Sequence, residues 1–229
     1  MMILGIETST PAAGIALVDE GVIAELRLKG PDHSETLIPS LSWLLSSLRL
    51  SLKDISAVAF SAGPGAFTGL RVGLSVAKGL SFSEGIPLVM VPTLDAIAYR
   101  MAFCREKLCV LLDAKRREVY ASIYDVSKGH PQRLYGPGAL PLEALLERIE
   151  GRAIFSGDGA IAFRERISGY MGERALFAPP HIAHTSAAAV AKLGAEMLGR
   201  GETADPFAAE PIYIRKSDAR PPRRRLKGP

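Results

Sequence analysis

The order of predicted elements repeats once along the chain, and this repeat constrains the fold more than any single motif. Each half reads as three strands, a helix, a strand, a glycine-rich turn, a helix, a strand and a final helix. In the first half these elements are predicted at 2–7, 14–19, 22–29, 34–48, 55–62, 68–82, 87–91 and 93 to about 103. In the second half they are predicted at 107–114, 117–126, 133–136, 141–149, 152–156, 160–168, 175–178 and 185–200.

The repeat predicts an α/β protein of two duplicated lobes, each a mixed sheet with flanking helices, facing each other across a cleft. We expect an N-terminal lobe at 1–104 and a C-terminal lobe at 105–218. Residues 219–229 form a separate basic tail, which we expect to be disordered.

The positive charge of the chain is concentrated in this tail. The chain has 28 basic and 24 acidic residues, and 219–229 contains five basic residues and no acidic one. Without these five, 23 basic and 24 acidic residues remain, so the rest of the chain is about neutral. The tail can contact RNA phosphates or simply improve solubility, and the sequence leaves both readings open.

No apolar run is long enough to cross a membrane, and the first residues lack the pattern of a secretory signal. The two cysteines, Cys104 and Cys109, form neither a disulfide framework nor a zinc-binding pattern. We therefore expect a cytoplasmic protein without a membrane partner.

The loop SAGPGAFTGLRVG, residues 61–73, joins a predicted buried strand to a predicted helix. It fails the Walker A template because Leu70 and Arg71 follow Gly69, and it fails the dinucleotide template because Thr68 occupies the position of the third glycine. Two readings remain: Gly63 and Gly65 bring a ligand close to a helix N-terminus, or they shape a tight turn.

The helix after this loop carries a ridge of small side chains. Gly69, Gly73, Ala77 and Ser81 recur at every fourth residue, with Val72, Val76 and Leu80 beside them. Such a face lets a second helix pack at short distance, and the partner can be the 34–48 helix or a helix of another subunit.

No catalytic or metal-binding constellation is evident. No serine or cysteine lies in an elbow motif with a histidine partner. His181 and His184 are three residues apart but have no carboxylate beside them, and His33 and His130 are predicted to be solvated in turns. We therefore predict neither a metal site nor catalytic residues.

Several motifs together resemble the TsaB (YeaZ) family, the bacterial partner of the transferase that attaches a threonylcarbamoyl group to a tRNA adenosine. The matching segments, in order over residues 2 to about 218, are ILGIETSTPAAGIAL, FSAGPGAFTGLRVGLSVAKGL, DAKRREVY, FSGDGA and PIYIRKSDA. The resemblance implies the duplicated actin-like (ASKHA) fold with RNase H-like lobes.

The resemblance also locates a nucleotide cleft, because two hairpins embrace the phosphates in that superfamily. Glu7, Thr8 and Ser9 correspond to the first hairpin and Asp113 to the second. Gly157, Asp158 and Gly159 lie where a later glycine turn approaches the nucleoside, and Gly63 and Gly65 of the loop at 61–73 complete the candidate cleft. ATP or ADP is the nucleotide that such a cleft would take, but we expect no cofactor. The catalytic relative TsaD carries a metal-binding histidine pair, and the corresponding segment here, 91–100, contains no histidine.

The resemblance finally implies a non-catalytic scaffold subunit that pairs with TsaD, with the ATPase TsaE joining the complex. Contact with tRNA is expected through the complex, with the tail as a candidate arm, and a homodimer is expected when the chain is alone. The expected interface lies on the helices 34–48 and 68–82, at Leu41, Leu45, Gly69, Val72, Gly73, Val76, Ala77 and Leu80. Gly73→Leu is expected to block partner binding and leave the fold intact. The alternative function is a stand-alone nucleotide-binding ATPase or kinase of the same superfamily.

Overall fold

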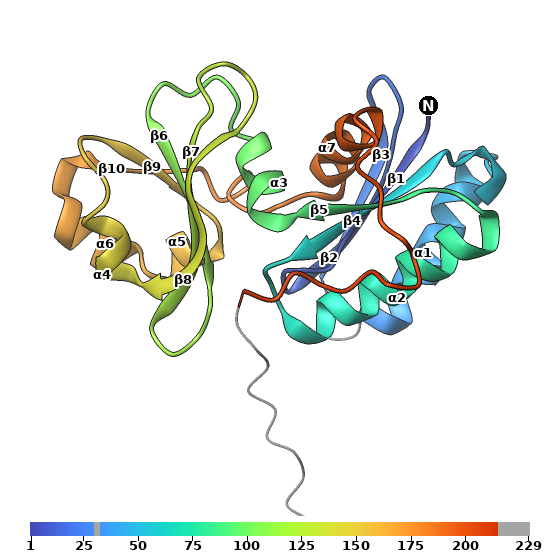
Figure 1. The fold of residues 1–229 in the computed structure, drawn as a ribbon, viewed down its shortest axis with the longest axis horizontal. Helices are drawn as coiled ribbons and strands as arrows, with labels where there is room; N and C mark the ends of the chain where they lie inside the picture. Colours follow the sequence, from blue (N-terminus) through green and yellow to red (C-terminus); the bar gives the residue numbers. More distant parts are fainter. Residues whose placement is uncertain (30–32, 215–229) are drawn as a thin grey trace, which may run out of the picture.

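Two five-stranded sheets stand side by side in the computed structural model, which describes residues 1–29 and 33–214 (Figure 1). The strand order is β3-β2-β1-β4-β5 in the first sheet and β8-β7-β6-β9-β10 in the second. In both sheets the first three strands in sequence pair antiparallel, and the last two run parallel to the first. The predicted duplication is therefore confirmed.

The first half of the chain forms its elements close to the predicted positions. They are β1 (Ile3–Glu7), β2 (Ala12–Val18), β3 (Val22–Lys29), α1 (His33–Ser47), β4 (Ala57–Gly63), α2 (Phe67–Glu84), β5 (Leu88–Pro92) and α3 (Thr93–Tyr99). A short 3-10 helix lies at Leu52–Asp54. Helix α2 ends where Gly85 adopts a left-handed φ of 65°, which glycine accommodates without steric cost.

The second half differs more from the prediction. Its elements are β6 (Lys107–Asp113), β7 (Glu118–Asp125), β8 (Gln132–Pro141), α4 (Leu142–Leu146), β9 (Ala153–Ser156), α5 (Asp158–Ala162), α6 (Arg164–Met171), β10 (Ala175–Phe177) and α7 (Ala187–Gly199), with a 3-10 helix at Gly172–Arg174. The third strand is ten residues long instead of the predicted four, and the helix predicted at 160–168 is divided at Phe163.

Strand alternation sends the side chains of β1 to two different layers. Leu4 and Ile6 pack with α1 and α2 on one face of the first sheet, while Ile3 packs with α7 on the other. The sheet is thus buried between two helical layers, as the continuous apolar strands β1 and β4 require.

Helix α7 lies unusually close to the first sheet because glycine and alanine line the contact. A Cβ atom on Gly5 would stand 2.1 Å from the carbonyl oxygen of Ala187, and one on Gly194 would stand 2.4 Å from the Cβ of Ala59. Both distances are shorter than any tolerated van der Waals contact, so these two positions need glycine for the observed spacing.

The final helices of the two lobes are exchanged between the sheets. Helix α3 packs Leu94 and Ile97 against Leu108 and Val110 of the second sheet, whereas α7 packs on the first sheet. The predicted assignment of 105–218 to the second lobe therefore needs correction. The C-terminal segment, residues 202–214, also returns to the first lobe, where Ala204 forms a β-bridge to Leu88.

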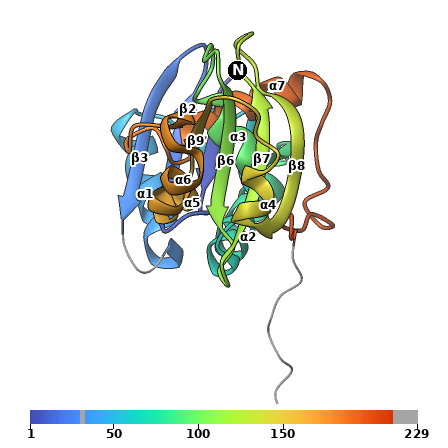
Figure 2. The ribbon, with the colours of Figure 1, turned by 90° about the vertical axis from the view of Figure 1, so that its left-hand side faces the viewer.

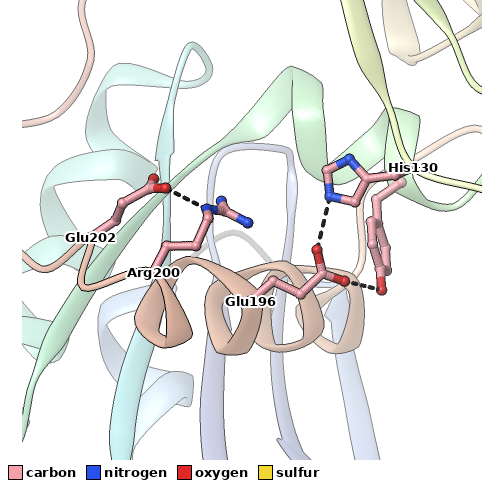
Figure 3. Close-up of polar contacts among 5 residues, drawn as sticks. His130, Glu196, Arg200 and Glu202 are labelled. Atoms are coloured by element: carbon pink, nitrogen blue, oxygen red, sulfur yellow. Dashed lines mark hydrogen bonds and ion pairs between the residues drawn. The ribbon is translucent and has the colours of Figure 1, made fainter.

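Two polar clusters join the lobes at α3. Asp95 accepts hydrogen bonds from the Tyr124 hydroxyl (2.6 Å) and from Arg133 (2.5 and 2.6 Å), which links α3 to β7 and β8. Glu196 of α7 accepts a hydrogen bond from the Tyr99 hydroxyl (2.8 Å) and pairs with His130 (2.8 Å) (Figure 3). His130 is therefore an inter-lobe contact, and the expectation that it is merely solvated is wrong.

The predicted tail, residues 219–229, lies outside the described residues. Within 1–29 and 33–214, none of the helices combines the length and the apolar character needed to cross a membrane.

Gly5→Ala tests the close contact of α7 with the sheet. The added methyl group meets the Ala187 backbone, so we expect the free energy of unfolding to fall by about 1–3 kcal/mol. Urea unfolding measures this loss. The control is Gly199→Ala in α7, whose added Cβ meets nothing within 4 Å, and equal stability of the two variants would contradict the packing argument.

Candidate functional site

The glycine loop after β4 is filled by the chain itself. A Cβ on Gly65 would stand 2.4 Å from the carbonyl oxygen of Ser9, and the amide of Ala66 donates a 2.7 Å hydrogen bond to that same oxygen. Gly63 has a φ of 116°, and a Cβ there would stand 2.7 Å from the carbonyl oxygen of Ile212. The glycines thus serve close backbone contacts, which favours the second reading of this loop.

Two further hydrogen bonds fix the loop between its flanking elements. The Thr93 hydroxyl accepts from the amide of Gly63 (3.1 Å) and bonds to the Ser61 hydroxyl (3.0 Å). The amide of Ile212 donates to the carbonyl of Ala62 (2.7 Å). The C-terminal segment therefore covers one side of the loop.

Glu7, at the end of β1, is buried and only partly satisfied. Its Oε1 accepts hydrogen bonds from the amide (2.7 Å) and hydroxyl (2.5 Å) of Ser9, while its Oε2 has no hydrogen-bond partner. The side chain is 2% exposed, and burial raises its pKa from 4.5 to about 7, against the opposing effect of the hydrogen bonds from Ser61 and Ser9. Thr8 turns the other way and donates to the Gly69 carbonyl (2.8 Å).

A small cavity adjoins Glu7 beneath the start of α7. Its volume is about 10 Å³, and it is lined by Glu7, Thr10, Ala12, Ala13, Gly14, Glu25, Arg27, Thr185, Ser186 and Ala187. Thr185 Oγ1 is buried there and also lacks a partner. This volume corresponds to roughly one water molecule.

The opposite hairpin places Asp113 beside Asp158. The amide of Asp113 donates to Asp158 Oδ1 (3.1 Å), and burial raises the pKa of Asp158. Asp113 itself accepts from the amide (2.8 Å) and the ammonium group (2.9 Å) of Lys115, as an aspartate that closes its own turn does.

The glycines at the turn from β9 into α5 also face backbone. A Cβ on Gly157, whose φ is 98°, would stand 1.9 Å from the Leu111 carbonyl oxygen, and one on Gly159 would stand 3.0 Å from the Leu112 carbonyl carbon. They allow α5 to lie close to β6.

The structure thus brings the predicted cleft residues together as two separate groups. One group is Glu7, Thr8, Ser9, Gly63 and Gly65 in the first lobe, and the other is Asp113, Gly157, Asp158 and Gly159 in the second.

His184 interacts electrostatically with Asp158 of the second group and with Arg27 of β3, which the sequence did not predict. Burial and the charge of Arg27 lower its pKa, while Asp158 acts to raise it. Arg100 holds the same segment by donating to the carbonyls of Ile182 (3.3 Å) and His184. Among the described residues, no three histidine, cysteine, aspartate or glutamate side chains converge in a geometry that could hold a metal ion.

The expected partner interface needs the largest correction. Leu41, Leu45, Gly69, Gly73, Ala77 and Leu80 are all buried in the first lobe. A Cβ on Gly73 would stand 2.1 Å from Thr8 Oγ1 and 2.7 Å from the Phe60 ring, so the small-residue ridge packs against the sheet. Gly73→Leu would therefore disturb the core. Val72 and Val76 alone of the predicted set remain half-exposed.

Other side chains of the same two helices do face solvent. Ile38 and Trp43 of α1 are 46% and 60% exposed, and Phe82 of α2 is 66% exposed. Gly79 of α2 is also exposed, and a Cβ there would meet nothing within 4 Å. The sequence gives a signal for Trp43, which is the single tryptophan of the chain and does not lie on the apolar face of α1 that the leucines form.

Comparisons with known proteins agree with this fold. The family model described as TsaD, tRNA N6-adenosine threonylcarbamoyltransferase, matches residues 20–222. The tRNA threonylcarbamoyladenosine biosynthesis proteins TsaB of Bacillus subtilis and Escherichia coli are each 28% identical to the chain, over 96% of the chain and 96% of each relative. The solved structure of YeaZ from Pseudomonas aeruginosa is 29% identical and has a TM-score of 0.77, over 93% of this chain and 100% of that one.

Glu7→Gln tests the buried carboxyl group. Because the pKa of Glu7 rises from 4.5 to about 7 on folding, the folded chain keeps a proton that the unfolded chain loses. Stability should therefore fall as pH rises from 4.5 to 7 and change no further above 7, by about 3 kcal/mol in total.

Urea unfolding between pH 5 and pH 8 measures this dependence. The glutamine variant should show a flatter profile and higher stability than the parent chain at pH 8. The exposed Glu20→Gln serves as control. A parent profile that rises between pH 5 and pH 7 and is unchanged by Glu7→Gln would contradict the assignment.

Proposed function

The chain belongs to the TsaD protein family and, within it, to the TsaB (YeaZ) group of actin-like proteins, and we propose that it is the non-catalytic partner subunit of TsaD. Its role lies in the biosynthesis of threonylcarbamoyladenosine in tRNA. In this proposal TsaD transfers the threonylcarbamoyl group and TsaE joins the complex. The complex lies in the cytoplasm, and this chain contacts tRNA only as part of it.

The observation that carries the proposal is the exposed apolar surface of α1 and α2. Ile38 and Trp43 of α1 and Phe82 of α2 are exposed, with the Phe82 ring packed edge-on against Phe207, and Val72 and Val76 of α2 are half-exposed. Exposed clusters of large apolar side chains mark interaction surfaces, and tryptophan is enriched where binding energy is concentrated. We call Ile38, Trp43, Val72, Val76 and Phe82, together with Gly79, the helix surface.

The geometry of the two hairpins supports the non-catalytic part of the proposal. The glycine loop is closed by Ser9 and Ile212, and Glu7 faces a space of about one water molecule. Asp113 is engaged with Lys115. These contacts support a structural role for Glu7 and Asp113.

The same helix surface would support self-association when TsaD is absent. Such a dimer would be isologous, because the surface on one copy would meet the identical surface on the other. The tail, residues 219–229, remains our candidate for an additional contact with tRNA phosphates.

Gly79→Arg tests the helix surface without disturbing the core. The new side chain points into open space, so the fold should be kept, while a charged group on the apolar surface should weaken TsaD binding roughly tenfold or more. Calorimetric titration with TsaD measures the affinity, and thermal unfolding confirms the fold.

Gly169→Arg is the matched control, because Gly169 also lies in a helix and also has nothing within 4 Å of an added Cβ. It belongs to α6 in the second lobe. If Gly79→Arg binds TsaD as tightly as Gly169→Arg does, the helix surface is not the interface.

Titration of the isolated chain with ATP or ADP and magnesium tests the non-catalytic reading. We expect no saturable binding heat at micromolar nucleotide and no release of phosphate, because the hairpins are closed. Micromolar binding followed by turnover would instead support the alternative, a stand-alone ATPase or kinase.

A further inference from the structure

A pocket in the second lobe combines an apolar floor with two positive charges. Its volume is about 240 Å³, and its lining residues are Lys107, Ile123, Leu134, Tyr135, Arg148 and Ile149. They come from β6, β7, β8 and the turn after α4, which Figure 2 shows from the side of this lobe. Lys107 begins β6, and Asp113 ends it, so the pocket lies at the opposite end of that strand from Asp113 and the β6–β7 turn.

The strand register explains how the floor is assembled. Ile123 of β7 is paired with Cys109 of β6 on one side and with Tyr135 of β8 on the other. Residues two apart on a strand share a face, so Lys107 projects on the same side as Cys109. Ile123 and Ile149 are each only 5% exposed, which makes the floor a fixed part of the lobe core.

The two cations stand at this floor without a carboxylate partner. Arg148 stacks its guanidinium over the Tyr135 ring, 4.7 Å from the ring centroid, and both Arg148 and Lys107 are exposed. Within the described residues neither of them forms an ion pair, whereas Arg166 in the same lobe pairs with Glu143. Stacking on a ring leaves the edge of a guanidinium group available for a bidentate contact.

Size and chemistry together select the ligand. Typical sites for drug-sized molecules measure about 300–1,000 Å³, so a smaller pocket fits a group the size of one amino acid residue. A bare inorganic anion would leave the apolar floor uncovered, and an uncharged apolar group would make no contact with the two exposed cations. We propose that this pocket binds a carboxylate carried on an apolar, residue-sized body, as in the C-terminal residue of a polypeptide or a free aryl or alkyl carboxylic acid.

The experiment uses the full chain and N-acetyl-L-phenylalanine as probe, followed by two-dimensional amide NMR. We expect saturable shifts at residues around 107, 123, 135 and 148, with a Kd on the order of 0.1–1 mM for a ligand of this size. The neutral N-acetyl-L-phenylalaninamide should bind roughly tenfold more weakly or not at all, because it lacks the charge that Arg148 and Lys107 recognise. Equal binding of acid and amide, or no saturable shift with the acid, would overturn the proposal.

Variants separate the charges from the floor. Arg148→Gln and Lys107→Gln should each lower the affinity for N-acetyl-L-phenylalanine roughly tenfold. Both residues are exposed, so the fold should be kept. Arg152→Gln removes an exposed arginine outside the pocket and should leave the affinity unchanged. If Arg148→Gln binds the acid as the parent does, the pocket is not the binding site.

A second titration distinguishes the two sources of the carboxylate. A short peptide that ends in phenylalanine with a free carboxylate should bind more tightly than the free acid if the natural ligand is a polypeptide C-terminus. Equal affinities indicate a small carboxylic acid. Blocking the carboxylate of the peptide as an amide should abolish binding in either case, and unchanged binding of the amidated peptide would overturn the proposal.

Discussion

The close contact between α7 and the first sheet is the interaction on which the rest of the molecule depends. Helix α7 lies close to β1 at Gly5 and close to β4 where Gly194 meets Ala59, because neither glycine has a side chain to separate the helix from the sheet. Thr185 and Ser186, directly before this helix, line the cavity beside Glu7. Near its other end the helix carries Glu196, which binds Tyr99 and His130 (Figure 3). One packing contact therefore closes the first lobe and joins it to the second.

The exchange of α3 and α7 makes the two lobes depend on each other. Each sheet covers one face with the final helix of the other half, so neither half of the sequence contains a complete core. Asp95 adds a polar contact at this junction, because its carboxylate accepts hydrogen bonds from both Tyr124 and Arg133. A junction with apolar packing and paired charges favours one fixed arrangement of the lobes.

The sequence predicts the element order and the duplication well, because both arise from local periodicity and from turn residues. It does not predict the exchange of helices, since nothing within 187–199 indicates which sheet that alanine-rich helix will cover. The burial of Glu7 was hidden for the same reason: the groups that enclose it, Thr185 to Ala187, are about 180 residues away. His130 likewise reads as a turn residue until Glu196 is placed beside it. These features depend on contacts between segments that are distant in the sequence, whereas the periodicity of a single sequence reports only local structure.

The partner interface predicted on the small-residue face of α2 shows the same limit of prediction from local sequence patterns. Small residues at every fourth position mark a smooth face of α2, and that pattern is equally suited to a sheet or to another helix. Each residue turns an α-helix by about 100°, so Gly79 points roughly 240° away from Gly73, which lies six positions earlier. Gly73 meets Thr8 and Phe60 in the core, while the position of Gly79 opens to solvent near the exposed Phe82. The inner face of α2 thus sets the distance of the helix from the sheet, and its outer face belongs to the surface that we propose for partner binding.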